Sequence, residues 1–238
     1  MTRGHTWQQV VQRIDATELP SADTEKPAFE WTLLPGNIAY VALNTFVSHE
    51  TADANLHAFP DFSQAQALIL DIRANDGGSG DVGFDILGTL TQQPFACSHS
   101  ETRKYRPVLR TWSQKMATHA FSDEPLPAHP TYHFAGKVVV VASAQTYSAA
   151  EDFAVAFDAM QRGRIFGEPT GGSTGQPLYI KLLGGGAART CTLNATSPDG
   201  KVFVGVGVQP DLLVRPTVAD LRAGTDTVLE AAQPESPG

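Results

Sequence analysis

Cysteine is scarce in this sequence, and the scarcity limits the metal and redox chemistry to expect. Of 238 residues only Cys97 and Cys191 are cysteines, so one disulfide is permitted but not established. Neither belongs to a C-x-x-C pair, the spacing that is typical of structural zinc sites. The sequence therefore predicts no paired-cysteine metal site, and it leaves the redox compartment undecided.

Metal-binding histidine patterns are also missing. The seven histidines are scattered along the chain, and none forms an H-E-x-x-H or comparable metal spacing. We therefore expect no catalytic metal ion, and no motif implies an organic cofactor.

Basic residues are in the minority, and long apolar runs are absent. The chain has 17 Lys and Arg against 25 Asp and Glu, a net charge of −8. Without a basic stripe, nucleic-acid binding is not expected. No run of 18 apolar residues occurs, so no membrane span is expected. The first ten residues, MTRGHTWQQV, have no apolar signal core. Localisation is otherwise unknown, and a bacterial periplasmic or secreted location stays open if the chain is a fragment.

What the sequence does contain is the pattern of an α/β protein. A length of 238 residues with 42% hydrophobic residues suits one large domain. Strand-like and helix-like segments alternate, and hairpin-like segments follow late in the chain. We predict a mixed, largely parallel sheet that is flanked by helices. The polar residues 1–30 are expected to be a linker or the remnant of an upstream segment, and residues 31–238 to form the domain.

The expected elements follow from hydrophobic periodicity and from the positions of glycine and proline. Strands are predicted at 37–46, 67–73, 95–106, 137–143, 164–167 and 202–208. Helices are predicted at 48–64 with an interruption at Pro60, 82–90, within 110–130, from 148 for about three turns, and at 217–232 with a break at Gly224. A hairpin is predicted from 177–183 and 188–194, which flank three glycines.

The segment from Lys137 to Asp158 organises the expected site. A run of β-branched residues ends near Ser143, and a helical pattern starts at Ser148. This arrangement places Ser148 at a helix N-terminus, where unpaired amides favour an anion. Ser148 with Glu151 also matches a capping box, so a purely structural role stays open.

Two glycine motifs are weaker signals. The residues from Gly78 to Gly83 spell G-x-G-x-x-G, the dinucleotide fingerprint, but four residues separate Arg73 from its first glycine, where an immediate turn is required. Residues 171–175 spell G-x-S-x-G, yet Pro177 and a β-rich stretch follow instead of a helix. We interpret the second motif as a loop and keep dinucleotide binding as a minor alternative.

Three separated stretches together resemble one known family. They are ALILDIRANDGG (67–78), TYSAAEDFA (146–154) followed by GEPTGGSTG (167–175), and GVGVQPDLLV (205–214). Their order and content resemble the C-terminal-processing (tail-specific) and tricorn-type serine peptidases, whose catalytic domain has a ClpP/crotonase-like fold. The resemblance covers roughly residues 30–230. It implies a peptide or protein substrate, and oligomerisation is common in the wider fold.

The resemblance also assigns roles to residues. It makes Ser148 the nucleophile and places the oxyanion hole at the amide of Ala149 and an amide of Gly77 or Gly78. Glycine allows close backbone approach, and two converging amides stabilise charge that develops in the transition state. Asp71 and Arg73 are expected to shape the glycine turn.

The general base departs from the family pattern. Tail-specific members carry a lysine 25 residues after the nucleophile, and that position here is Ser173. Tricorn-type members use a histidine in an upstream segment, so the candidates here are His5, His49 or a histidine outside this sequence. The glutamate that orients the base in the family aligns near Val204, and the common PDZ module is missing. A rival interpretation is therefore a non-catalytic module that binds peptide or lipid, like the repeats of interphotoreceptor retinoid-binding protein.

Overall fold

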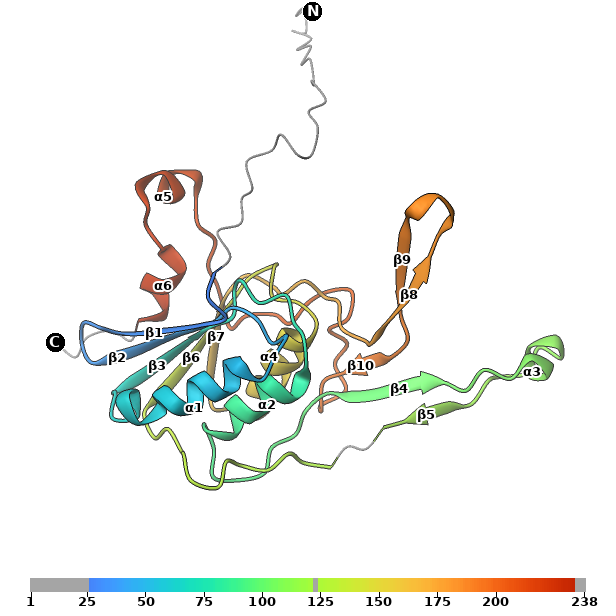
Figure 1. Cartoon of the computed structure of the whole chain (residues 1–238), viewed down its shortest axis with the longest axis horizontal. Coiled ribbons are helices and arrows are strands. Elements are labelled where there is room, and N and C mark those ends of the chain that lie inside the picture. Colours follow the sequence, from blue (N-terminus) through green and yellow to red (C-terminus); the bar gives the residue numbers. More distant parts are fainter. Residues whose placement is uncertain (1–25, 122–123, 234–238) are drawn as a thin grey trace, which may run out of the picture.

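The computed structural model describes residues 26–121 and 124–233, which form a central sheet with helices on both faces (Figure 1). The sheet has six strands in the order β1-β2-β3-β6-β7-β11. Their bounds are Phe29–Leu34 (β1), Ile38–Leu43 (β2), Ala67–Asp71 (β3), Lys137–Ala142 (β6), Gly163–Gly167 (β7) and Leu212–Leu213 (β11). β1 pairs antiparallel with β2, and the remaining neighbours are parallel. The predicted mixed, largely parallel sheet is confirmed.

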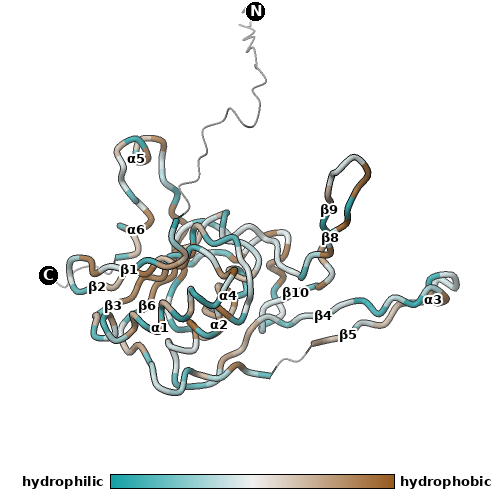
Figure 2. The backbone as a smooth tube through the Cα atoms, in the orientation of Figure 1, coloured by the Kyte–Doolittle hydropathy of each residue, from teal (hydrophilic) through white to brown (hydrophobic). Residues whose placement is uncertain are grey.

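The two central strands are buried because their side chains are apolar on both faces. Every residue of β3, with the sequence ALILD, is buried, and β6 contributes Val138, Val140 and Val141. Parallel strands covered on both sides have this continuous apolar character. Figure 2 shows the hydrophobic colour concentrated along these strands.

Three helices cover one face of the sheet, and the C-terminal segment covers the other. The first set is α1 (Glu50–Phe62), α2 (Gly80–Gly88) and α4 (Ala149–Ala159). Its core includes the fully buried rings of Phe46, Phe62, Phe153 and Phe157. On the opposite face, α6 (Thr227–Ala232) packs Val228 and Ala232 against Ile69 and Phe166. α5 (Val218–Ala223) precedes it and ends at Gly224, whose φ of 71° is left-handed.

Two arms extend from the sheet region (Figure 1). The first arm contains β4 (His99–Arg103), α3 (Pro107–Thr111) and β5 (Thr118–Ala120), and β10 (Asn194–Thr196) pairs with β4. The second arm, which we call the ribbon, is the hairpin of β8 (Pro177–Lys181) and β9 (Ala187–Cys191) joined through the 3-10 turn η2 (Leu183–Gly185). All ten strand residues of the ribbon are exposed.

Several sequence-based expectations were wrong in detail. Pro60 lies inside α1 instead of interrupting it. The region 110–130 contains the end of the short helix α3 and the strand β5 in place of a long helix. Residues 202–208 form turns and not a strand, because Gly205 and Gly207 have φ of 89° and 80°.

Candidate active site

The backbone of Ser148 has a strained conformation. Its φ is 54° and its ψ is −123°, a region that non-glycine residues rarely adopt. Such a conformation costs on the order of 1–3 kcal/mol and persists only where surrounding contacts enforce it. Ser148 directly precedes α4 and is half-buried.

The capping-box interpretation of Ser148 and Glu151 is not what the structure shows. The Ser148 side chain makes no cap hydrogen bond to α4. Glu151 is fully buried and turns away to bind the 168–176 loop. Its carboxylate accepts hydrogen bonds from Thr170 Oγ1 (2.5 Å), Gly172 N (2.6 Å) and Ser173 N (2.6 Å). The Ser148 hydroxyl is therefore left for another partner.

The same loop contacts Ser148. Ser148 N donates to the carbonyl oxygen of Ser173 at 3.1 Å, and Thr170 Oγ1 also accepts from Val208 N at 2.7 Å. Gly205 N in turn donates to the carbonyl oxygen of Gly172. The loop thus connects Ser148 to residues 203–208, which the sequence alone did not link to the site. Val204, where the family has a base-orienting glutamate, packs against the core.

The glycine turn after β3 lies directly against Ser148. A Cβ placed on Gly77 would approach the Ser148 Cβ to 2.6 Å and the Ala149 nitrogen to 3.1 Å. On Gly78, a Cβ would approach the Phe46 carbonyl carbon to 2.1 Å. Both glycines have positive φ, 108° and 136°. Only glycine fits at these two positions, and the tight approach brings this turn and the start of α4 together.

The two glycine amides differ in their hydrogen bonds. Gly77 N donates to Asn75 Oδ1 at 2.9 Å, and the Asn75 amide donates to the Leu43 oxygen at 2.9 Å. The amide of Gly77 is thereby occupied, whereas no hydrogen bond is found for the amides of Gly78 and Ala149 among the described residues. Asn75 is fully buried and was missed by sequence analysis. Its position two residues before the glycine pair was the available signal, because Asn side chains often cap such turns.

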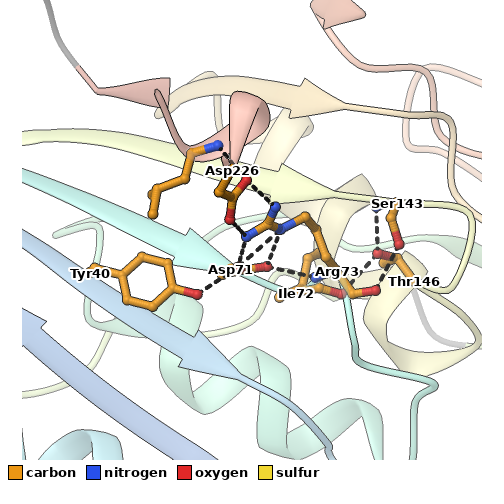
Figure 3. A network of polar contacts seen from close by, with 8 residues as sticks. Tyr40, Asp71, Ile72, Arg73, Ser143, Thr146 and Asp226 are labelled. Carbon is orange, nitrogen blue, oxygen red and sulfur yellow. Dashed lines mark hydrogen bonds and ion pairs between the residues drawn. The ribbon is translucent and has the colours of Figure 1, made fainter. Parts of the chain in front are cut away.

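A polar network behind the turn fixes the ends of β3 and β6 (Figure 3). Thr146 Oγ1 donates to the Ile72 oxygen (2.8 Å), and Ser143 Oγ donates to the Arg73 oxygen (2.7 Å). The guanidinium of Arg73 bridges Asp71 and Asp226, with contacts of 2.6 and 2.7 Å. The residues after β6, which lead to Ser148, are therefore anchored to the strand that leads to the glycine turn.

The contacts in this network change the pKa values of three side chains. Burial raises the pKa of the Tyr40 phenol, and the neighbouring Asp71 raises it further. Burial alone would lower the pKa of Arg73, but the hydrogen bonds to Asp226 and Asp71 outweigh it and raise the pKa. For Asp226, the hydrogen bonds from Arg73 outweigh burial and hold the pKa below its ordinary value. Arg73 stays charged, and the contacts support the structural role expected for Asp71 and Arg73.

Two cavities open beside Ser148. The larger, of about 600 Å³, is lined by Gly78, Ser148, Ala149 and Asp152 among others, and the smaller, of about 550 Å³, by Gly77, Ser148, Ser173 and Arg189 among others. Neither cavity has a histidine or lysine among the described residues that line it.

The two candidate bases have different positions. His49, just before α1, lies 3.7 Å from Asp85 on α2 and lines neither cavity. His5 lies outside the described residues. The structure therefore brings Ser148, Ala149, Gly77 and Gly78 together and does not bring His49 to them.

No metal cluster is found within the described ranges, where no group of three or more His, Cys, Asp and Glu side chains is placed to hold an ion. Cys97 and Cys191 are not joined in a disulfide. Each described helix is too short or too polar to span a bilayer.

Comparison with known proteins points to one family. Residues 37–214 match the family described as Peptidase family S41. The chain is 27% identical over 183 residues to the chloroplastic C-terminal processing peptidase of Tetradesmus obliquus, covering 76% of this chain and 36% of the relative. It is 24% identical over 199 residues to a carboxy-terminal-processing protease of Bartonella bacilliformis, covering 82% and 42%. The chain thus spans less than half the length of these relatives.

Among solved structures, the fold resembles the photosystem II D1 C-terminal processing protease. The TM-score is 0.57 at 26% identity, and the match covers 85% of this chain and 49% of that one. The match supports the expected fold and the recognised family, and it does not favour a non-catalytic binding module.

Proposed function

Because the chain belongs to peptidase family S41, we propose that it is a serine peptidase that cleaves peptide bonds through an acyl-enzyme on Ser148. The observation that carries the proposal is the strained Ser148 backbone, held beside a glycine turn whose Gly78 amide is unoccupied among the described residues. Two relatives carry the name of C-terminal processing peptidase or protease. Peptides and proteins are the proposed substrates.

The first half of the reaction forms the acyl-enzyme. Ser148 Oγ attacks the carbonyl carbon of the scissile bond while a base takes the hydroxyl proton. The carbonyl oxygen becomes an oxyanion, which the amides of Ala149 and Gly78 are placed to receive. Gly77 is proposed to support Gly78, since its own amide donates to Asn75. The intermediate collapses, the C–N bond breaks, and the leaving amine takes the proton from the base.

The second half releases the product. Water attacks the Ser148 ester, the base takes a proton from the water, and a second tetrahedral intermediate collapses to the carboxylic acid. Ser148 then regains its proton. No step needs a metal ion or an organic cofactor.

The base is proposed to be a histidine. His5 is favoured over His49, since His49 faces Asp85 and lines neither cavity. A histidine from outside this sequence is the other source. A serine hydroxyl is a poor nucleophile without a base, so reactivity of Ser148 reports whether a base is present.

The test is covalent labelling with a fluorophosphonate probe, followed by peptide mapping. We expect the wild-type chain to be labelled at Ser148 and Ser148→Ala to lose all labelling while keeping its thermal unfolding temperature. Loss of labelling in His5→Ala but not in His49→Ala would identify the base. A folded wild-type chain without labelling would show that these 238 residues supply no base to Ser148, and would favour a binding module or an enzyme whose base comes from outside this sequence.

Self-association is also part of the proposal. The ribbon exposes five large apolar side chains, Leu178, Tyr179, Ile180, Leu182 and Leu183. An isolated two-stranded hairpin is marginally stable in water, so a second surface over the ribbon is expected to stabilise it. Light scattering at increasing protein concentration tests this, and a constant monomer mass would contradict it.

A further inference from the structure

The larger cavity beside Ser148 contains a carboxylate that the reaction does not use. Asp152 lies one helical turn after Ser148, and its backbone N–H donates to the backbone carbonyl oxygen of Ser148 at 3.2 Å. Its carboxylate accepts hydrogen bonds from Thr174 Oγ1 (2.9 Å) and Ser98 Oγ (3.1 Å). Both partners are neutral hydroxyls, and no lysine or arginine within the described ranges forms an ion pair with Asp152.

The charged side chains that line this cavity are all acidic. Its described lining contains two carboxylates, Asp81 and Asp152, and no lysine, arginine or histidine. Hydroxyl groups make up much of the remaining polar surface, from Ser79, Ser98, Ser100, Thr102, Thr174 and Thr192. The smaller cavity differs, because its lining contains both Arg189 and Asp76. The two cavities beside Ser148 thus present different electrostatic environments.

Desolvation makes the carboxylate of Asp152 costly to ionise. Burial, with a further contribution from nearby Glu151, raises the pKa of Asp152 above its ordinary value, although the hydrogen bonds from Thr174 and Ser98 oppose the shift. A cation that entered the cavity would relieve this cost by pairing with the carboxylate. The hydroxyl partners would stay in place, because each carboxylate oxygen has a second lone-pair direction.

Resting on the proposed function, we infer that the larger cavity is a specificity subsite that receives a lysine or arginine side chain of the substrate next to the scissile bond. The charged end pairs with Asp152. The aliphatic stem packs between Phe84 and Phe121, which line the same cavity. Long basic side chains combine an apolar stem with a charged end in this way.

The volume is consistent with this occupant. About 600 Å³ accommodates an extended lysine or arginine with residual water. Ser148, Ala149 and Gly78 line the cavity together with Asp152, so a side chain bound there belongs to a residue flanking the scissile bond. Asp152 would be a specificity-determining residue and would take no part in proton transfer.

The experiment compares peptidyl diphenyl phosphonates that differ only at the side chain beside phosphorus. A lysine probe is matched with a norleucine probe, which has the same stem without charge, and with a glutamate probe. We expect the lysine probe to label Ser148 at least about tenfold faster than the norleucine probe, and the glutamate probe to be slowest. Asp152→Asn should reduce the lysine-to-norleucine rate ratio about tenfold. A ratio near one in the wild-type chain would overturn the inference.

A matched control is available on the same helix. Asp158 is exposed and lines neither cavity, so Asp158→Asn should keep the wild-type rate ratio. An equal reduction by Asp158→Asn and Asp152→Asn would indicate a general charge effect and overturn the subsite.

Binding separates this inference from the proposed function. Calorimetry measures the affinity of Ser148→Ala for a lysine peptide and for its norleucine counterpart, and it needs no catalysis. If no probe labels Ser148 but the lysine peptide binds about tenfold tighter than the norleucine peptide, Ser148 lacks a base in this chain and the subsite still stands. Equal affinities would overturn the subsite.

Discussion

The sheet region around Ser148 and the two arms differ in how deeply their residues are buried and in how many contacts hold them. Around Ser148, buried groups such as Asn75 and Glu151 pair with backbone amides, and glycines admit backbone contacts closer than any side chain allows. In the ribbon and around α3, side chains are exposed and only one strand neighbour holds each strand of the ribbon. The comparison teaches that buried hydrogen bonds and close glycine contacts fix the backbone around Ser148, whereas the arms present exposed side chains to their surroundings.

The largest difference between the regions is expected for a glycine-to-alanine pair. Gly78→Ala would bring a Cβ to 2.1 Å from the Phe46 backbone at a φ of 136°, so we expect a loss of about 4 kcal/mol or more, or no folded protein. Gly184→Ala in the ribbon meets nothing within 4 Å at a φ of 80°, and should cost only about 1 kcal/mol. Urea unfolding measures both. Equal losses of unfolding free energy in the two variants would contradict the difference between the sheet region and the ribbon.

A pair of aromatic truncations tests the same contrast through packing. Phe153 is fully buried on α4, and Phe153→Ala should cost about 3–5 kcal/mol because it leaves a cavity. Trp112 beyond α3 is 64% exposed, and Trp112→Ala should change the unfolding free energy by less than about 0.5 kcal/mol. A large cost at Trp112 would show that the first arm is packed against a partner in solution.

An intermediate effect is expected for Glu151→Gln. The buried carboxylate accepts three hydrogen bonds from the 168–176 loop, and a charged acceptor is worth about 1.5–3 kcal/mol per bond in stability. We expect fluorophosphonate labelling of Ser148 to slow by on the order of tenfold or more. Glu168→Gln removes a more exposed pair with Arg215 and is the control. Similar labelling rates for both variants would dismiss Glu151 as a positioning residue.

The smallest effect on the free energy of unfolding is expected for Asp226→Asn, which removes the ion pair between the C-terminal segment and Arg73. Asp226 has a lowered pKa, so its pairing with Arg73 stabilises the protein above the ordinary pKa of about 3.9 and is lost as pH falls through the lower folded value. Because Asp226 is partly exposed, solvent screening limits Asp226→Asn to about 1 kcal/mol. Thermal unfolding at pH 7 and pH 3 measures it, and the difference between the two proteins should be smaller at pH 3 than at pH 7.

Sequence patterns predicted the elements whose signals are local. β3 and β6 were predicted because uninterrupted apolar runs indicate strands covered on both faces, and α4 because its helical spacing begins abruptly at Ser148. The same locality explains the failures. Residues 202–208 alternate like a strand, but Gly205 and Gly207 turn the chain toward the 168–176 loop. Nothing in the local pattern indicates that distant partner.

In the candidate site, too, some residues could be predicted from the sequence and others could not. Ser148 and the glycine pair follow from the family resemblance, and their proximity agrees with it. The pairing of Glu151 could not be predicted, because S-x-x-E is also the pattern of a capping box and only the position of residues 170–173 separates the two. Asp152 gave no signal, since a carboxylate in the first helical turn is ordinary on electrostatic grounds.

The dependence of the 168–176 loop on residues 203–208 has a consequence for the timing of synthesis. The hydroxyl of Thr170 and the oxygen of Gly172 find their partners in Val208 and Gly205. A nascent chain that has emerged only as far as residue 200 already contains the nucleophile and the glycine turn, but not the contacts that hold the loop against them. The loop beside Ser148 would therefore reach its folded form only after residues 203–208 have left the ribosome, later than every strand of the six-stranded sheet except β11.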